Sequence, residues 1–586
     1  KARKMFEKVK DIKLFQEIGI GNSNFGEIRK NNYFYVDKTE FIREWWKQGP
    51  LTTLITRPRR FGKSLTLSMV KYFFSTEYAN EKDDIFKGTK IWYDEKMMKI
   101  QGTFPVISIS FGKCKFQDVN SIVNSIKHEI VDATRSFKQV LLQDADKLDD
   151  NEINFIKSIN YEMNDEVAFN AINKICMFIN RVYNKNVIIL LDEYDSPILN
   201  FLENRDDIGL TKVNTFLMNF FCSTFKENEF LQRALIVGIT QISNESIFSG
   251  FNNMQVIKTS SYQYSTTFGF TFLEVQEALK KYGLGLWKEL IITWYDGYCF
   301  GSTTQIFNPW SITKFLYELR EPECYWLKTS DNSLVEDFVR QCSPSLSSLL
   351  IDLLQNHEVY ISIQEVISLN EIYARKPEAI ISLLVASGYI SITGKVMRDN
   401  ISFSMLKIPN FEIEQLFNRI ITTWFEKSYS YSDFINDFIK CDIKSLNINL
   451  NQILLDCIGT FDSVECFFHG LCFNMVIELR DRFDILSNSQ RLDIIFIPKD
   501  ITKDNKAYII EFKYRNKLQN CKKETKTVLL ELVQEALQQS DDKCYYQDLI
   551  KRGIEQKNIV RYAMVFYDLE CLAAIQGVNN GIIHYD

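Results

Sequence analysis

Residues 51–74 read LTTLITRPRRFGKSLTLSMVKYFF, and this stretch decides the fold of the first half of the chain. A short β-branched run is followed by a tight turn and then by apolar residues at helical spacing. The turn ends in Gly62-Lys63-Ser64, which opens the helix. Because backbone N–H groups at a helix N-terminus attract anions, this strand, turn and helix indicate a nucleotide-phosphate loop. In such a loop Lys63 would reach the outer phosphates and the Ser64 hydroxyl would ligate Mg²⁺.

The loop departs from the usual pattern at its first position. Arg57 stands five residues before Gly62, where a glycine is usual, and residues 58–61 are Pro-Arg-Arg-Phe. Gly62-Lys63-Ser64 by itself fits an ordinary basic helix start equally well. The phosphate-loop interpretation, with Arg57 among the nucleotide-binding residues, therefore needs a second signal.

The second signal lies about 130 residues later in NVIILLDEYDSPI (186–198), an apolar strand that ends in Asp192-Glu193. A carboxylate at the end of a strand can hold the water shell of Mg²⁺, and its acidic neighbour can orient or deprotonate an attacking water. With both parts in this order, we expect ATP and Mg²⁺ to bind, with Glu193 as the catalytic residue of a weak ATPase. The arginine that would assist hydrolysis is not identified. The candidates are Arg57, Arg59, Arg60 and Arg233.

Short β-branched runs alternate with long amphipathic segments around these motifs. The runs are residues 51–56, 105–111, 186–191 and 233–240. Buried strands alternating with helices predict a largely parallel sheet covered by helices. We therefore expect an α/β domain of the P-loop NTPase type at residues 20–255, after an N-terminal extension at residues 1–19.

Helical patterns dominate residues 256–440, which we interpret as a lid and connector. Within them, residues 377–409 predict a helix followed by a two-stranded hairpin, the outline of a winged helix. The alternative is a plain connector, which is favoured because the expected wing carries only Lys395 and Arg398.

Residues 453–580 again show a mixed α/β pattern and contain a second set of candidate catalytic and metal-binding residues. Asp493 lies in the predicted strand RLDIIFIP, and Glu511 and Lys513 lie in the predicted strand AYIIEFKY. Alternate side chains of a strand share a face, so Glu511 and Lys513 point together. If the two strands are neighbours, Asp493 and Glu511 can bind Mg²⁺ while Lys513 positions or activates water against a phosphodiester. The alternative is a solubilising charge pair on an edge strand.

Further residues support the second set. Glu465 and His469 share one face of the preceding predicted helix, so Glu465 could complete the metal-binding acidic cluster, whereas a lone His is more often a packing residue. Gln539 and Tyr545 follow on a later helix. Residues 499–528 hold nine Lys and Arg against four Asp and Glu, and such a positive rim would favour a phosphate backbone. An ordinary solvated charge run is the alternative.

The composition excludes several classes of protein. The chain has 586 residues, 46% of them hydrophobic, and a net charge of −6, which excludes a uniformly basic nucleic-acid coat. The sequence contains no run of eighteen apolar residues, so it predicts no membrane-spanning helix. Thirteen cysteines without a C-x-x-C pair, and only four histidines, indicate buried thiols in a reducing compartment and not zinc sites. The chain starts without Met or an apolar signal core, so we expect a cytoplasmic protein that is either a fragment or a processed form.

Six blocks of the sequence together resemble a known family. They are YVDKTEFI, LITRPRRFGKSLTLSMVKYFF, LLDEYDSPI, SIFSGFNN, WYDGYCFG and FNPWSI. In this order they are similar to the blocks of the prokaryotic "AAA-ATPase-like" family, whose members typically carry a C-terminal nuclease-like domain of the PD-(D/E)XK class. The resemblance covers about residues 14–575, and the loop RPRRFGKS is its most specific part.

The resemblance implies roles that the residues alone do not. It implies that the absence of the first glycine is common in the family. It would also place Asp37 and Lys38 in the wall of the nucleotide pocket. Where the family tends to have an arginine after the strand RALIVGIT, this chain has Gln241. An amide can hydrogen-bond a γ-phosphate but supplies no charge, so the resemblance implies slow turnover.

The sequence thus predicts an ATP-binding domain coupled to a restriction-endonuclease-like domain that hydrolyses phosphodiester bonds of nucleic acid with Mg²⁺. We expect a nucleic acid as the partner, with DNA favoured over RNA and the choice between them left open, and homo-oligomer formation is also left open. The alternative is a non-catalytic, ATP-dependent switch or scaffold whose nuclease-like domain only binds DNA or protein.

Overall fold

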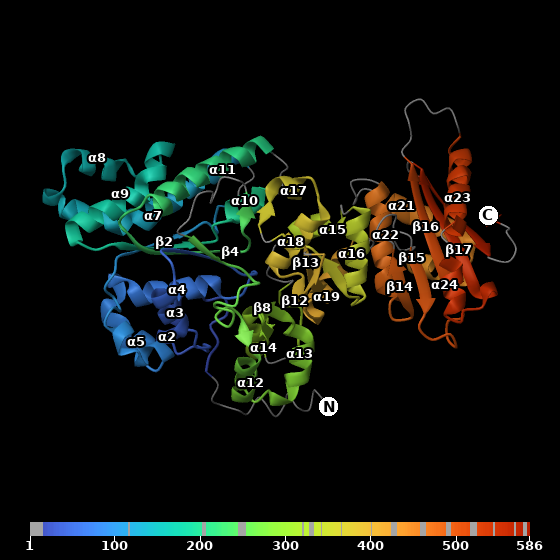
Figure 1. Ribbon diagram of the computed structural model, residues 1–586, viewed down its shortest axis with the longest axis horizontal. Coiled ribbons are helices and arrows are strands. Elements are labelled where there is room, and N and C mark those ends of the chain that lie inside the picture. The colour runs from blue at the N-terminus through green and yellow to red at the C-terminus, as the bar shows by residue number, and fades with distance from the viewer. Residues whose placement is uncertain are drawn as a thin grey trace. The chain divides into compact units, whose positions relative to one another are not determined.

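The computed structural model shows an α/β protein in which most of the predicted elements form (Figure 1). It describes residues 16–114, 118–201, 207–243, 254–318, 321–326, 333–340, 343–364, 366–399, 401–423, 431–457, 464–487, 494–515, 524–542, 545–567, 570–577 and 583–585.

The chain divides into two compact units. The first consists of residues 1–326, 362–395 and 409–411, and the second of residues 327–361, 396–408 and 412–586. The segment expected as a connector at residues 256–440 is therefore shared, with its first part and residues 362–395 belonging to the first unit.

A five-stranded parallel sheet organises the first unit. Its strands are β1 (Thr52–Thr56), β2 (Val106–Ser110), β3 (Val187–Asp192), β4 (Leu231–Gly238) and β6 (Met254–Ile257), in the order β2-β3-β4-β1-β6. All four strand pairs are parallel, which confirms the predicted α/β class. β1 is buried throughout and β3 at all residues but its last, as expected of a sheet covered on both faces.

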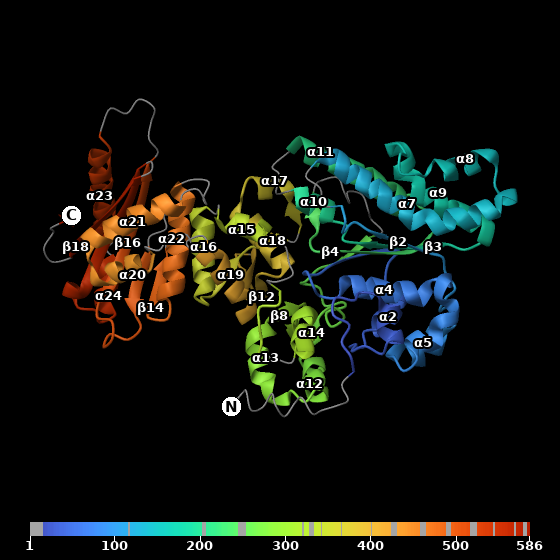
Figure 2. The ribbon, with the colours of Figure 1, turned by 180° about the vertical axis from the view of Figure 1, so that it is seen from behind.

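Helices cover the two faces of this sheet (Figures 1 and 2). On one side lie α7 (Val119–Gln143), α9 (Asp165–Tyr183) and α11 (Asp207–Phe221). On the other lie α2 (Phe25–Lys30), α4 (Lys63–Phe74) and α5 (Lys82–Phe86). The remaining helices of this part are α3 (Glu40–Gln48), α6 (Glu95–Met98), α8 (Asp150–Ser158) and α10 (Ser196–Phe201).

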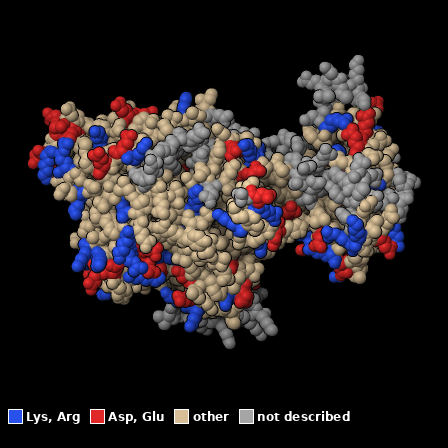
Figure 3. Space-filling model, viewed as in Figure 1, with Lys and Arg blue, Asp and Glu red and all other residues tan. Residues whose placement is uncertain are grey.

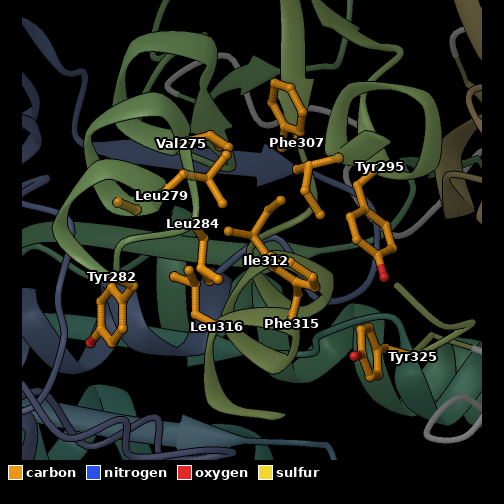
Figure 4. Close-up of a cluster of buried hydrophobic side chains, with 12 residues drawn as sticks. Val275, Leu279, Tyr282, Leu284, Tyr295, Phe307, Ile312, Phe315, Leu316 and Tyr325 are labelled. Carbon is orange, nitrogen blue, oxygen red and sulfur yellow. The ribbon is translucent and has the colours of Figure 1, made fainter. Parts of the chain in front are cut away.

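A small helical subdomain follows the sheet within the first unit. It contains α12 (Phe272–Lys281), α13 (Lys288–Tyr295) and α14 (Pro309–Glu318), with a three-stranded sheet of β7 (Phe270–Thr271), β8 (Tyr298–Phe300) and β9 (Thr303–Phe307). Figure 4 shows its core, in which Val275 and Leu279 of α12 meet Ile312 and Phe315 of α14. We call residues 270–326 the helical subdomain.

The helix and two-stranded hairpin predicted at residues 377–409 are present. The chain around them runs through α15 (Ser333–Arg340), α16 (Pro344–Leu354), β10 (Val359–Ile361), β11 (Ile367–Ser368), α17 (Leu369–Tyr373), α18 (Pro377–Ser387), β12 (Ser391–Arg398), β13 (Ile401–Lys407) and α19 (Phe411–Thr423). β12 and β13 form the predicted hairpin, and β10 joins them in the order β10-β13-β12. A short strand β5 (Ile242–Ser243) pairs with β11 in parallel.

A six-stranded mixed sheet organises the second unit, as the class prediction requires. Its strands, in spatial order, are β14 (Phe483–Ser487), β15 (Ile494–Pro498), β16 (Ala507–Arg515), β17 (Ile559–Tyr567), β18 (Glu570–Gly577) and β19 (Ile583–His584). β16 and β17 are parallel, and the other pairs are antiparallel.

Helices cover both faces of the mixed sheet. They are α20 (Tyr431–Lys440), α21 (Ile443–Cys457), α22 (Val464–Leu479), α23 (Thr525–Asp542) and α24 (Tyr545–Lys551). On one face, the ring of Phe438 in α20 lies 4.8 Å from the rings of both Tyr508 and Tyr562. On the other, Leu532 of α23 packs in one cluster with Ala563 of β17. Adjacent residues of β17 thus face opposite helices.

Charges of both signs are interspersed on the face of the molecule shown in Figure 3. None of the helices in the described part of the chain is both long and apolar enough to cross a membrane.

Candidate functional sites

The phosphate-loop segment joins β1 to α4, as the sequence predicts. Gly62 is the residue immediately before α4, and its φ of 80° lies in the left-handed region that favours glycine. The turn can therefore reverse the chain and point the first N–H groups of α4 into the loop.

The side chain of Lys63 lies against the backbone of this loop. Its Nζ donates to the backbone oxygens of Arg57 at 2.9 Å and Pro58 at 2.7 Å, and its side chain is buried. Burial lowers the pKa of Lys63 to about 8, against the opposing effect of the carboxylates of Asp192, Asp195 and Glu193. The ammonium thus lies between the loop backbone and an acidic cluster.

Asp192 ends β3 next to Ser64. Burial raises the pKa of Asp192 to about 6, opposed by a hydrogen bond from Ser64 and by the charge of Lys63. Its Oδ1 atom is buried without a hydrogen-bond partner in the described structure. A carboxylate oxygen left unsatisfied beside a hydroxyl is a donor set that fits Mg²⁺, which prefers oxygen ligands. The predicted residues Lys63, Ser64 and Asp192 are brought together.

Glu193 has a strained backbone and little space around it. Its φ is 50°, which is uncommon outside glycine and typical of functional positions. A Cβ atom at Gly112 would lie 2.9 Å from Glu193 Oε2, so this carboxylate lies against the backbone of Gly112.

Two residues that the sequence interpretation missed tie the site together. Asp195 Oδ2 accepts hydrogen bonds from the N–H groups of Ile239 at 2.8 Å and Thr240 at 3.0 Å, and the Tyr194 hydroxyl donates to Thr240 O at 2.6 Å. These bonds join the chain after β3 to the end of β4. Gln241 follows, with its Oε1 buried and unpartnered within the described residues. The second acid of the D-E-Y-D sequence was the available signal.

The four candidate arginines differ in position. Arg233 donates to the carbonyl oxygens of Trp46 at 2.6 Å and Pro50 at 2.9 Å, before β1 and therefore at the opposite end of that strand from the phosphate loop. Arg57 is fully buried, donates to Lys258 O at 2.7 Å, and has its pKa lowered to about 9 by burial. These two arginines make contacts within the fold, so Arg59 and Arg60 remain the candidates for assisting hydrolysis.

Aromatic residues of the helical subdomain support the loop. The Arg57 guanidinium lies 4.8 Å from the ring centroid of Phe300, and that of Arg60 lies 4.7 Å from that of Trp310. The Phe61 ring packs 5.3 Å from that of Phe300. The unusual loop residues, which replace the common glycine-rich turn, are thus the ones that contact the WYDGYCFG and FNPWSI segments.

Asp37 and Lys38, expected in the pocket wall, make contacts within the fold. Asp37 accepts from the N–H groups of Thr39 at 2.9 Å and Lys90 at 2.7 Å. Lys38 pairs with Glu274 at 2.7 Å. These bonds connect α3 with the turn at Lys90 and with the start of α12.

The second candidate site lies on β16. Its alternate residues Glu511, Lys513 and Arg515 face α23, because Lys513 Nζ contacts Gln539 Oε1 and Arg515 pairs with Glu535 at 2.9 Å. Glu511 is buried at 1% exposure, although it is a carboxylate. A buried acid beside a lysine held by an amide is an arrangement that can bind a cation and direct a water.

The expected pairing of the two strands is confirmed. β15 and β16 are antiparallel, with Ile494 opposite Ile510, next to Glu511. Asp493, the residue before Ile494, lies outside the described residues, and so does the side chain of Glu465. The described part of the chain contains no group of three or more His, Cys, Asp and Glu arranged to hold a metal.

Helix α22, which carries Glu465, packs on the other face of the sheet. The Phe468 ring is stacked on that of Phe512 at 5.8 Å, and His469 Nδ1 lies 2.8 Å from Ser347 Oγ in a buried position. This environment fits the packing role of His469. The side chain of Tyr545, at the start of α24, lies outside the described residues.

Part of the basic run at residues 499–528 is paired with acids. Lys499 lies 3.8 Å from Asp484 and Lys503 lies 3.5 Å from Asp500, in addition to the Arg515 pair. Residues 516–523, which hold three more lysines, are outside the described ranges.

Comparisons with known proteins match both parts of the chain. A family model described as "Predicted AAA-ATPase" matches residues 19–248, and one described as "PD-(D/E)XK nuclease superfamily" matches residues 464–574. An uncharacterized protein in the vnfD 5′ region of Azotobacter chroococcum mcd 1 is 26% identical over 411 residues, which are 69% of this chain and 70% of that protein. Each candidate site lies inside one of the two matched ranges.

Proposed function

Since the chain contains a predicted AAA-ATPase-like domain and a domain of the PD-(D/E)XK nuclease superfamily, we propose that it binds ATP at the first and hydrolyses phosphodiester bonds of DNA at the second. ATP binding is proposed to control cleavage. The protein acts in the cytoplasm, which fits the lack of disulfide bonds among its described cysteines.

The observation that carries the nucleotide part is the meeting of Lys63, Ser64 and Asp192 at the end of β1 and β3. Lys63 binds the β- and γ-phosphates, while Ser64 and Asp192 hold Mg²⁺ directly or through its waters. Mg²⁺ supplies neutralisation of the phosphate charge when bound. Glu193 orients the attacking water, and Gln241 offers a neutral hydrogen bond to the γ-phosphate. Because no charge stands at position 241, hydrolysis is slow.

At the second site, Glu511 would hold Mg²⁺ together with Asp493, while the third predicted ligand, Glu465, belongs to α22, which packs on the other face of the sheet. Lys513 positions the water that attacks the phosphodiester, and Gln539 holds the Lys513 ammonium in place. The proposal for this site rests on the buried Glu511 carboxylate beside Lys513.

The test is cleavage of labelled double- and single-stranded DNA by the purified full chain with Mg²⁺. The Lys513→Ala variant should abolish cleavage. The control Lys503→Ala removes a lysine of the same basic run that is paired locally with Asp500 at 3.5 Å, and it should cleave like the parent. Cleavage that persists in Lys513→Ala would refute the assignment.

A second candidate function is an ATP-dependent switch that binds DNA or protein without cutting. The observation that favours it is the pairing of Lys499, Lys503 and Arg515 with acids, which reduces the positive surface open to a phosphate backbone. ATP binding without cleavage of any nucleic acid would select this function.

A further inference from the structure

A cavity of about 380 Å³ lies beside the phosphate loop in the first unit. Its wall comprises Pro58, the chain after β6, the β8–β9 hairpin, the end of α18 and the start of β12. Gly62, Lys63 and Asp192 are not among the described residues that line it. Pockets for small molecules typically span about 300–1,000 Å³, so this cavity has the size of a ligand site of its own.

The lining has a definite chemistry. Six serine and threonine residues line it, Thr259, Ser260, Ser302, Thr304, Ser391 and Thr393. Lys395 adds a positive charge, and no Asp or Glu is among the described lining residues. The aromatic residues of the wall are Tyr298 and Phe300, which are buried, and Tyr262, whose ring is exposed. Hydroxyl and ammonium donors suit a phosphate, and aromatic faces suit a planar base.

We propose that this cavity binds a nucleoside monophosphate, linear or cyclic, as a second ligand distinct from the ATP of the phosphate loop. The phosphate is directed to Lys395 and the hydroxyls, and the base to the aromatic rings. A nucleoside monophosphate carries the anion, the hydroxyls and the planar ring that the lining would satisfy.

The cavity and the phosphate loop share residues. The Pro58 carbonyl, which accepts from Lys63 Nζ at 2.7 Å, belongs to a residue of the cavity wall. Phe300 lines the cavity and contacts both the Arg57 guanidinium and the Phe61 ring. A ligand that shifts Pro58 or Phe300 therefore changes the loop that holds Lys63. The effect of the cavity ligand on the phosphate loop rests on the proposed ATP binding. The binding of a ligand in the cavity does not rest on it.

Gly388 adds a close contact at the same place. It ends α18 at a φ of 89°, and a Cβ atom there would lie 2.7 Å from the Pro58 Cβ. Since Gly388 also lines the cavity, α18 and the phosphate loop meet at its wall. Any coupling between the two ligands is reciprocal, so each must change the affinity of the other by the same factor.

The binding test is isothermal titration calorimetry of the full chain with four probes, 5′-AMP, 5′-GMP, 3′,5′-cyclic AMP and 3′,5′-cyclic GMP. We expect at least one probe to bind with a Kd below about 1 mM. The same probe should still bind the Lys63→Ala variant, in which the proposed ATP site lacks its lysine. Absence of binding by all four probes would overturn the proposal.

Variants of exposed lining residues locate the binding. Lys395→Glu should weaken the probe at least about tenfold, Lys395→Arg should retain it, and Thr393→Trp, which fills the cavity, should abolish it. ATP binding should persist in all three. Unchanged probe affinity in Lys395→Glu and Thr393→Trp would refute the site, and loss of ATP binding in both would show that the cavity belongs to the ATP site. If the parent binds a probe but not ATP, the proposed function fails and the cavity assignment stands.

Discussion

The carboxylate of Asp195 accepts the backbone N–H of Thr240 at 3.0 Å, and this bond joins the acidic segment after β3 to the residue before Gln241. In the D-E-Y-D sequence, the two candidate site residues Asp192 and Glu193 are thus followed by Tyr194 and Asp195, which bond to the chain at the end of β4. The geometry of Gln241 relative to Asp192 depends on this connection.

Removal of the Asp195 carboxylate should therefore destabilise the first unit. In Asp195→Ala the N–H groups of Ile239 and Thr240 lose their acceptor while buried, which costs about 1–3 kcal/mol. Asp195→Asn keeps an acceptor oxygen and should cost less. Urea denaturation followed by circular dichroism measures both, and equal stability of Asp195→Ala and the parent would contradict the role.

Binding of Mg²⁺ and ATP should strengthen as the pH rises through about 6. The pKa of Asp192 is raised to about 6 by burial, so the carboxylate is protonated below that pH and cannot serve the cation. For folding the sign is opposite. The native state holds this proton more tightly than the unfolded chain, so the group's contribution to stability falls as the pH rises from about 4 to about 6.

The measurement is the affinity of a fluorescent ATP analogue with Mg²⁺ between about pH 5 and pH 8. In the Asp192→Asn variant, whose residue 192 cannot ionise, the affinity should be low and should lack the rise near pH 6. A parent profile without a rise near pH 6 would contradict the assignment.

The Phe61 ring should be needed for the phosphate loop to hold its shape. It is 1% exposed and packs against Tyr298 and Phe300 at 4.9 and 5.3 Å. Truncation of a buried Phe to Ala costs about 3–5 kcal/mol, and Phe61→Leu should cost less. We expect Phe61→Ala to lower thermal stability and ATP affinity together. Normal ATP affinity in a folded Phe61→Ala protein would show that the loop does not need this support.

An arginine at position 241 should accelerate ATP hydrolysis. The Gln241 amide offers no charge, and charged donors directed at a γ-phosphate commonly raise turnover by several orders of magnitude. Steady-state phosphate release by Gln241→Arg, with Gln241→Lys as a second cation, measures the effect. A rate for Gln241→Arg equal to that of the parent would remove the explanation for slow turnover.

Gln539 should matter for cleavage through Lys513. Its Oε1 contacts the Lys513 Nζ, so Gln539→Leu releases the ammonium, and we expect DNA cleavage to fall about 10–100-fold with little change in stability. The matched control is Arg515→Leu, which breaks a surface pair on the same face of β16 and should cleave within about twofold of the parent. Equal losses in both variants would assign the effect to the packing of α23.

Local patterns predicted much of this structure. The spacing of apolar residues within a short window predicted the strand, turn and helix at residues 51–74 and the acidic end of β3. The alternation of side chains along a strand predicted that Glu511 and Lys513 share a face. The order of the blocks supplied the rest of the domain plan. The exact division of the connector between two units did not follow, because contacts and not composition decide it.

Contacts over long sequence distances could not be predicted. Lys38 pairs with Glu274, 236 residues away, and Arg57 is buried against Phe268 and Phe300. The residues next to Lys38 and Arg57 in the sequence do not reveal these partners. Arg233 follows the same logic, since its partners precede β1. A single sequence shows that these residues are charged but not which distant partners bury them.

If nucleotide at the phosphate loop controls DNA cleavage at the β16 site, ATP must change the cleavage rate only while the loop is intact. The measurement is the ratio of the initial DNA cleavage rates with and without ATP, for the parent and for Lys63→Ala under the same Mg²⁺ concentration. We predict a ratio clearly different from one for the parent and equal to one for Lys63→Ala, with cleavage in both lost on Lys513→Ala. A parent ratio of one, or an ATP response that survives in Lys63→Ala, would contradict the account.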